Sequence, residues 1–125
     1  MKKELLAGFT LLSLILGAAY NLIYLKQLVQ NMNAHLSTAE QAYSINNFSA
    51  AESELSTALE IWLQADEYTH IFIRHSEIDA ATDAYYDALS SVREKDASAP
   101  SFIQKVKYHI NSIYSMELLT LKSIF

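Results

Sequence analysis

The strongest constraint on this chain is a run of 21 residues without a charged side chain, from Leu5 to Leu25. A helix of about 20 apolar residues crosses a hydrocarbon core of roughly 30 Å, so this run has the length of a membrane span. Lys2 and Lys3 precede it, and lysines before a span favour a cytoplasmic N-terminus. The sequence therefore predicts that residues 1–25 form a membrane anchor in contact with the lipid bilayer.

The outer end of the run has the residues expected at a membrane interface. Tyr20 and Tyr24 suit an aromatic belt, and the amide of Asn21 can reach the polar region at the same level. A cleaved signal peptide is the alternative, because Gly17-Ala18-Ala19 has small residues at the spacing that signal peptidase accepts. The apolar character continues through Leu25 into a helical pattern. We therefore expect an uncleaved, single-pass anchor in the cell membrane.

The rest of the chain, residues 26–125, is predicted to be an extracytoplasmic domain with an acidic surface. The chain has 9 Lys+Arg and 14 Asp+Glu; Lys2, Lys3 and Glu4 precede the run, which leaves 7 and 13 and a formal net charge of −6. Nucleic acids and anionic lipid surfaces are bound through clustered cations, so neither is an expected partner of this domain. Cysteine is absent, which excludes disulfides, lipoprotein anchoring and thiolate metal sites.

Glycine and proline are scarce after the anchor, and this favours an all-α fold. The two glycines are Gly8 and Gly17, and Pro100 is the one proline, so tight β-hairpin turns are poorly served. A heptad-like seam, here called the seam, follows the anchor at alternating steps of 3 and 4: Leu22, Leu25, Val29, Met32, Leu36, Ala39 and Tyr43. Seam and anchor are uninterrupted, which predicts one helix from about residue 4 to 45.

Three further helices are expected. Asn46-Asn47 interrupts the first pattern, and Ser49 with Glu52 fits a capping box for a second helix in which Trp62 is a core residue. Ser76 with Asp79 offers the same signature for a third helix. Pro100 suits the first turn of a fourth. The prediction is a transmembrane helix that continues into an antiparallel bundle of about four helices.

A polar cluster, predicted to be structural, joins the connection between the second and third helices to the fourth helix. It consists of Arg74, His75, Glu77, Asp79 and Glu117. Glu117 lies on the apolar stripe of the fourth helix, where an unpaired buried charge is costly. Antiparallel third and fourth helices would bring residues 74–79 close to it. We therefore expect His75 or Arg74 to pair with Glu117 and to set the register of the bundle.

The same residues have two functional interpretations. His75 and Asp79 are four residues apart and, with Glu77 and Glu117, could hold zinc or manganese, but no HExxH pattern occurs. A hydrolase that uses His75 with Ser76 or Glu117 has no nucleophile elbow to support it. The sequence thus predicts no catalytic residues, no metal site and no cofactor. A ligand- or metal-sensing domain centred on His75, Glu77, Asp79 and Glu117 is the alternative.

These features together resemble a family of small membrane-anchored bacterial proteins, domain of unknown function 4363. The residues that carry the resemblance are Trp62, His75-Ser76-Glu77-Ile78-Asp79, Glu117 and the closing Ser123-Ile124-Phe125. Ser123 stands where the family has Asn, and Phe48 where many members have Trp. The resemblance covers almost the whole chain. It implies a membrane location and a helical bundle, and it leaves the activity open.

The function expected from these patterns is that of a non-enzymatic interaction or scaffold module in the bacterial cell envelope. A chain of about 100 residues outside the membrane buries a modest core, so help from a partner is plausible. The expected partners are the bilayer, through residues 5–25, and another envelope protein. Self-association along the seam, Leu22 to Tyr43, is a further option.

Overall fold

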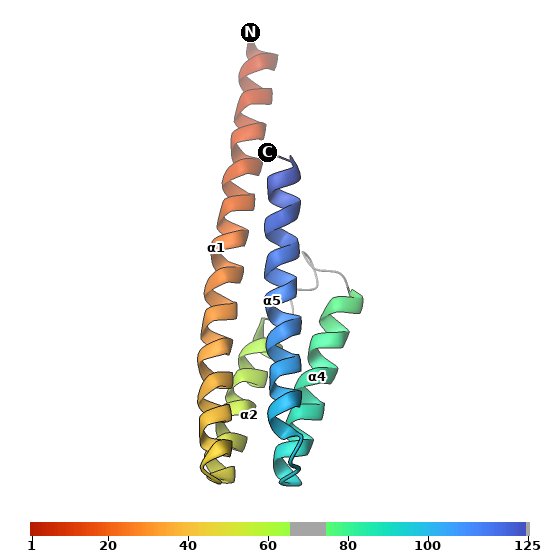
Figure 1. The fold of residues 1–125 in the computed structure, drawn as a ribbon. Helices are drawn as coiled ribbons and strands as arrows, with labels where there is room; N and C mark the ends of the chain where they lie inside the picture. The colour runs from red at the N-terminus through yellow and green to blue at the C-terminus, as the bar shows by residue number, and fades with distance from the viewer. Residues whose placement is uncertain (66–74, 125) are drawn as a thin grey trace.

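Four helices make up the part of the chain that the structure describes. The structure, a computed structural model, describes residues 1–65 and 75–124, with only the backbone for His75 and Ile124. Its helices are α1 (Lys2–Ser44), α2 (Phe48–Gln64), α4 (His75–Arg93) and α5 (Ala99–Ile124). Helices α1 and α4 each pack against both α2 and α5, and packed neighbours run antiparallel (Figure 1). The predicted all-α bundle with a long N-terminal helix is confirmed.

Helix α1 is one unbroken helix with two different halves. Every residue from Met1 to Gly17 is exposed, and Leu25 is the first buried one. By length and composition the apolar half can be a membrane span or a signal sequence. All seam residues from Leu25 onward are buried against the chain's own helices. A second copy could pair along the seam only by displacing α2 or α5.

The connection from α1 to α2 corrects one prediction. Asn46 has a positive φ of 63°, which turns the chain immediately after α1. Asn47 is the N-cap of α2, and its side-chain oxygen accepts from the Ala50 amide at 3.3 Å. The predicted cap, Ser49, already lies inside the first turn and is exposed. Its proposed partner Glu52 accepts from Arg93 Nε at 2.8 Å instead.

The other two predicted helix starts have different outcomes. Ser76 is the second residue of α4, so its predicted role as N-cap is wrong. Pro100 lies in the first turn of α5, as predicted, because its fixed φ suits that position. In the turn before it, Asp96 accepts from the Ser98 amide at 2.9 Å and from the Ser98 hydroxyl at 2.8 Å. These hydrogen bonds lower the pKa of the Asp96 carboxyl.

The core between the helices is mostly apolar, and two of its polar side chains, Trp62 and Tyr85, contact residues of other helices. The Trp62 indole N–H donates to Thr82 Oγ1 at 2.9 Å, which confirms Trp62 as a core residue. The Tyr85 hydroxyl lies 3.2 Å from Met32 Sδ, and burial raises the pKa of Tyr85. Apolar residues of α2, α4 and α5 supply most of the remaining core: Ala51, Leu55, Ala58, Leu59, Ile78, Ala81, Ala88, Leu89, Val92, Ile103, Val106, Ile110 and Ile113.

Candidate functional site

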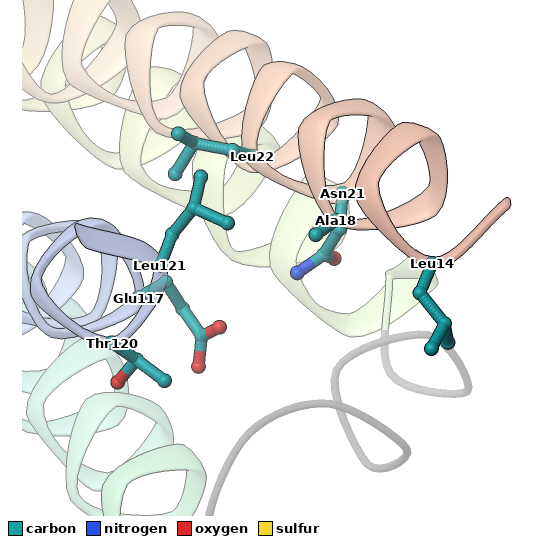
Figure 2. Close-up of a pocket in the computed structure, with 7 residues that line it drawn as sticks. All are labelled: Leu14, Ala18, Asn21, Leu22, Glu117, Thr120 and Leu121. Atoms are coloured by element: carbon teal, nitrogen blue, oxygen red, sulfur yellow. The ribbon is translucent and has the colours of Figure 1, made fainter. Parts of the chain in front are cut away.

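A pocket of about 290 Å³ lies between α1 and the C-terminal turns of α5. Its walls are mostly aliphatic, with three polar side chains among them. Figure 2 shows Asn21 of α1 and Glu117 of α5 directed toward the same space. The lining residues are Leu14, Ala18, Asn21, Leu22, Glu117, Thr120 and Leu121. The predicted anchor and the predicted outer domain therefore meet along this pocket.

The position of Glu117 follows from the periodicity of α5. Ile113, four residues earlier, is the last buried residue among the described side chains of α5, and Leu121, four residues later, lines the pocket. Residues four apart lie on the same face of a helix, so Glu117 continues the inward-facing stripe. The helix has passed the closed part of the core at this point. Glu117 is consequently half-buried against α1 rather than enclosed.

The electrostatic surroundings of Glu117 disfavour its charge. Burial raises the pKa of its carboxyl, and the negative charge of Glu77 raises it further. Glu77, in the first turn of α4, is therefore close enough to act on Glu117. A neighbouring cation would have the opposite effect on the pKa, because it favours the ionised form. The charge of Glu77 near the start of α4 thus disfavours ionisation of Glu117 on α5.

Asn21 is the residue whose role the sequence analysis missed. Its place at the membrane interface stays a prediction; in the structure its Oδ1 is buried and has no hydrogen-bond partner among the described residues. A buried acceptor without a partner costs about 1–3 kcal/mol. The hydroxyl of Thr120 already donates to the Met116 carbonyl at 2.9 Å, which leaves its oxygen as an acceptor. The polar part of the pocket therefore combines the Glu117 carboxyl, the Asn21 amide and the Thr120 oxygen.

The remaining members of the predicted cluster are distributed differently. Arg74 and the side chain of His75 lie outside the described residues, so their pairing with Glu117 stays a prediction. Asp79 is exposed on α4. Within residues 1–65 and 75–124 no group of three or more His, Asp and Glu side chains has a geometry suited to a metal ion.

Polar contacts away from this pocket also hold α1 to its neighbours. His35 Nδ1 lies 2.6 Å from Glu54 Oε2 of α2, and Lys107 Nζ of α5 lies 2.5 Å from Glu40 Oε1. Gln104 donates to both oxygens of Glu40, at 3.0 and 2.9 Å. Each of these residues is next in sequence to a buried residue of its own helix. A position beside the apolar stripe was therefore the one feature of the sequence that could have identified them.

Comparison with known families identifies the chain. Residues 19–124 match the family described as "Domain of unknown function (DUF4363)". The chain belongs to this family. The match begins at Ala19, so the DUF4363 domain includes the outer end of the apolar run as well as the bundle. Neither the curated proteins nor the solved structures contain a match. DUF4363 carries no stated activity, and the function must be argued from the geometry.

Proposed function

We propose that this DUF4363 protein is a single-pass membrane protein that acts as a non-enzymatic interaction or scaffold module in the bacterial cell envelope. Its N-terminus is cytoplasmic and its bundle extracytoplasmic. The observation that carries the proposal is the division of α1 into an exposed apolar half and a buried half without any break between them. Such a helix places a folded bundle at a fixed distance from the bilayer.

The surface available to a protein partner lies on α4 and α5. Tyr86 and Tyr108 are large aromatic residues that project from the bundle, and both are more than half exposed. Aromatic side chains are enriched where proteins bind one another, because they bury a large area with few rotatable bonds. The partner is another envelope protein or a second copy that contacts this surface.

Site-specific cross-linking in intact cells tests this proposal. A photoreactive residue replaces Tyr86 or Tyr108 in the full chain, and Glu94 and Ser90, which are exposed polar positions on or just after α4, serve as controls. We expect a discrete protein adduct at one or both tyrosine positions and weaker adducts at the controls. A chain that gives no adduct at any position, and that leaves mild detergent as a monomer, would contradict the interaction function.

Cation sensing is the second candidate, and the repulsion that Glu77 exerts on Glu117 favours it. A divalent cation between these carboxylates would relieve the repulsion that raises the pKa of Glu117. Purified full-length protein is therefore heated with and without calcium, manganese or zinc. A rise in melting temperature that Glu117→Gln abolishes, while Glu94→Gln does not, would support sensing. No rise with any of the three ions would eliminate it in its metal form.

A further inference from the structure

The packing of α5 against α1 sets the level that the end of α5 reaches along the membrane helix. Thr120 and Leu121 line a common pocket with Leu14, Ala18 and Leu22 of α1. These three α1 residues belong to the uncharged run, and Figure 1 shows the C-terminal end of α5 alongside the same part of α1. The end of α5 is therefore level with the apolar run and not with the acidic bundle.

The depth of this overlap follows from the interface residues of α1. Tyr20 is exposed and Asn21 lies beside it, so the outer boundary of the hydrocarbon falls near this level. From Leu5 to Leu22 the helix rises about 26 Å, which is close to the thickness of a thin bilayer core. Lys2, Lys3 and Glu4 prevent the core from extending further in the N-terminal direction. The boundary thus cannot move far below Tyr20 without leaving the run too short to cross.

The side chains at the end of α5 suit a position at and just below this boundary. Glu117 stands opposite Asn21 across the pocket. Beyond it the apolar residues Leu118, Leu119, Leu121 and Ile124 are interspersed with Thr120, Lys122 and Ser123, and Leu119, at 65% exposed, faces away from the protein. Lys122 is exposed about one turn further on, and its long stem allows the ammonium group to return to the headgroup region. An exposed leucine beside an apolar membrane helix has lipid as its natural neighbour.

We propose that the last two turns of α5, from Glu117 to Ile124, enter the outer leaflet beside α1, so that the protein contacts phospholipid through two helices. The inference rests on the proposed anchor. Glu117 and Asn21 then lie at the level of the headgroups, and Leu119 and Leu121 lie among the acyl chains. The second contact resists rocking of the bundle on the membrane surface, because one helix alone leaves that motion free.

Spin labels at single cysteines test the depth directly, since the chain has no cysteine of its own. The full chain is reconstituted into phosphatidylethanolamine–phosphatidylglycerol vesicles with a nitroxide at Leu119→Cys. Tyr108→Cys is the matched control, because Tyr108 lies on the same helix and is 69% exposed against 65% for Leu119. The two positions are about 16 Å apart along α5. Leu12→Cys, exposed on α1, reports insertion of the anchor.

Relaxation by oxygen, which concentrates in lipid, is compared with relaxation by a water-soluble nickel chelate. We expect the oxygen-to-nickel ratio at Leu119→Cys to exceed that at Tyr108→Cys several-fold and to approach that at Leu12→Cys. All three positions are exposed, so labelling does not disturb the core, and retained helicity of each variant is the folding check.

Each other outcome overturns the inference in a distinguishable way. If Leu12→Cys is in lipid and Leu119→Cys is as accessible to nickel as Tyr108→Cys, the anchor stands and the second contact is wrong. If Leu12→Cys is itself accessible to nickel, the proposed anchor fails and the inference fails with it. If Leu119→Cys is shielded from both reagents and its spectrum shows dipolar broadening, a second copy covers this surface in place of lipid.

Discussion

The hydroxyl group of Thr82 takes part in two hydrogen bonds at once. It donates to the Ile78 carbonyl at 2.9 Å and accepts from the indole N–H of Trp62, also at 2.9 Å. Trp62 is 2% exposed, so water cannot replace Thr82 as the acceptor. The hydrogen bond from Trp62 to Thr82 thereby fixes the orientation of the indole, the largest side chain in the core.

Replacing Thr82 with valine keeps the shape of the side chain and removes the acceptor. We expect Thr82→Val to lower the free energy of unfolding by about 1–3 kcal/mol, because the indole N–H is left buried without a partner. The control is Thr57→Val on α2, where the hydroxyl donates only to the Ser53 carbonyl and is partly exposed. Urea denaturation followed by the fluorescence of Trp62, the one tryptophan in the chain, measures both. Equal losses in the two variants would refute the role of Thr82.

Glu117 gives the protein a pH dependence whose sign can be worked out. Its pKa is raised in the folded state above the ordinary 4.5, so the folded protein holds this proton more tightly than the unfolded chain does. The stability contributed by the proton is present below pH 4.5 and is lost as the pH rises through the raised pKa. We therefore expect Glu117→Gln, which cannot ionise, to be more stable than the wild type at pH 7.

The gain from Glu117→Gln is expected to stay below about 1 kcal/mol, because the half-buried carboxylate is screened by solvent. It should disappear below pH 4.5, where the wild-type carboxyl is protonated in both states. Thermal denaturation in detergent from pH 4 to 8 measures the difference, with Glu94→Gln as an exposed control. A loss of stability at pH 7 would instead favour the predicted pairing of Glu117 with Arg74 or His75.

At the scale of residues, the sequence predicted which side chains are buried better than it predicted which residues they contact. Trp62 was predictable as a core residue because its position continues the apolar stripe of α2. That Thr82 is its acceptor was not predictable, because two helices decide it together. Glu117 was singled out correctly as an unusual carboxylate on an apolar stripe. The unpaired Asn21 oxygen opposite it depends on how far α5 extends along α1, and no local pattern records that distance.

At the scale of elements, the start of α2 allows a sharp test of which residue caps the helix. Asn47→Ala removes the side chain that accepts from the Ala50 amide, and we expect it to lower the free energy of unfolding by about 1 kcal/mol. Ser49→Ala, at the residue predicted from the capping-box pattern, should change it by less than 0.5 kcal/mol, as is usual for exposed positions. Urea denaturation of both variants decides between them. The reverse order of effects would restore Ser49 as the cap.

Sequence patterns predict the lengths and buried faces of these helices better than their ends. Helix lengths and buried faces follow from periodicity, since an apolar stripe must pack in every arrangement of the bundle; the seam in α1 is the clearest case. Helix ends were predicted less well. Asn46 turns the chain with a positive φ, so the N-cap of α2 is Asn47, two residues before the predicted N-cap Ser49. Backbone geometry of this kind is not visible as a pattern of residue types.

At the scale of the whole molecule, the two halves of α1 should separate under truncation. A chain that begins at Ala19 keeps every buried residue of α1, so we expect it to fold with a melting temperature close to that of the full protein. A chain that begins at Ser37 lacks Leu25, Met32 and Leu36 and should not form the bundle. Circular dichroism during heating measures both. Cooperative melting of the chain that begins at Ser37 would show that the bundle folds without the α1 residues before Ser37.

The antiparallel bundle was predictable because helices joined by short connections pack side by side in opposite directions. The structure confirms this arrangement. The pocket between α1 and α5 was not predictable. It exists because α5 continues beyond Ile113 along α1, and the closed part of the core ends there. The extent of such an overhang depends on the axial register of two helices that are distant in sequence, which their separate periodicities leave undetermined.

The continuity of α1 has a mechanical consequence. Its 43 residues, at about 1.5 Å each, form a rod of roughly 65 Å with no hinge in it. An apolar helix that is longer than the local bilayer is thick tilts to bury its excess length. If α1 crosses the membrane as proposed, its lower and upper parts cannot bend independently, so the bundle leans by the same angle. Membrane thickness would thus set the angle at which the protein presents Tyr86 and Tyr108 to its surroundings.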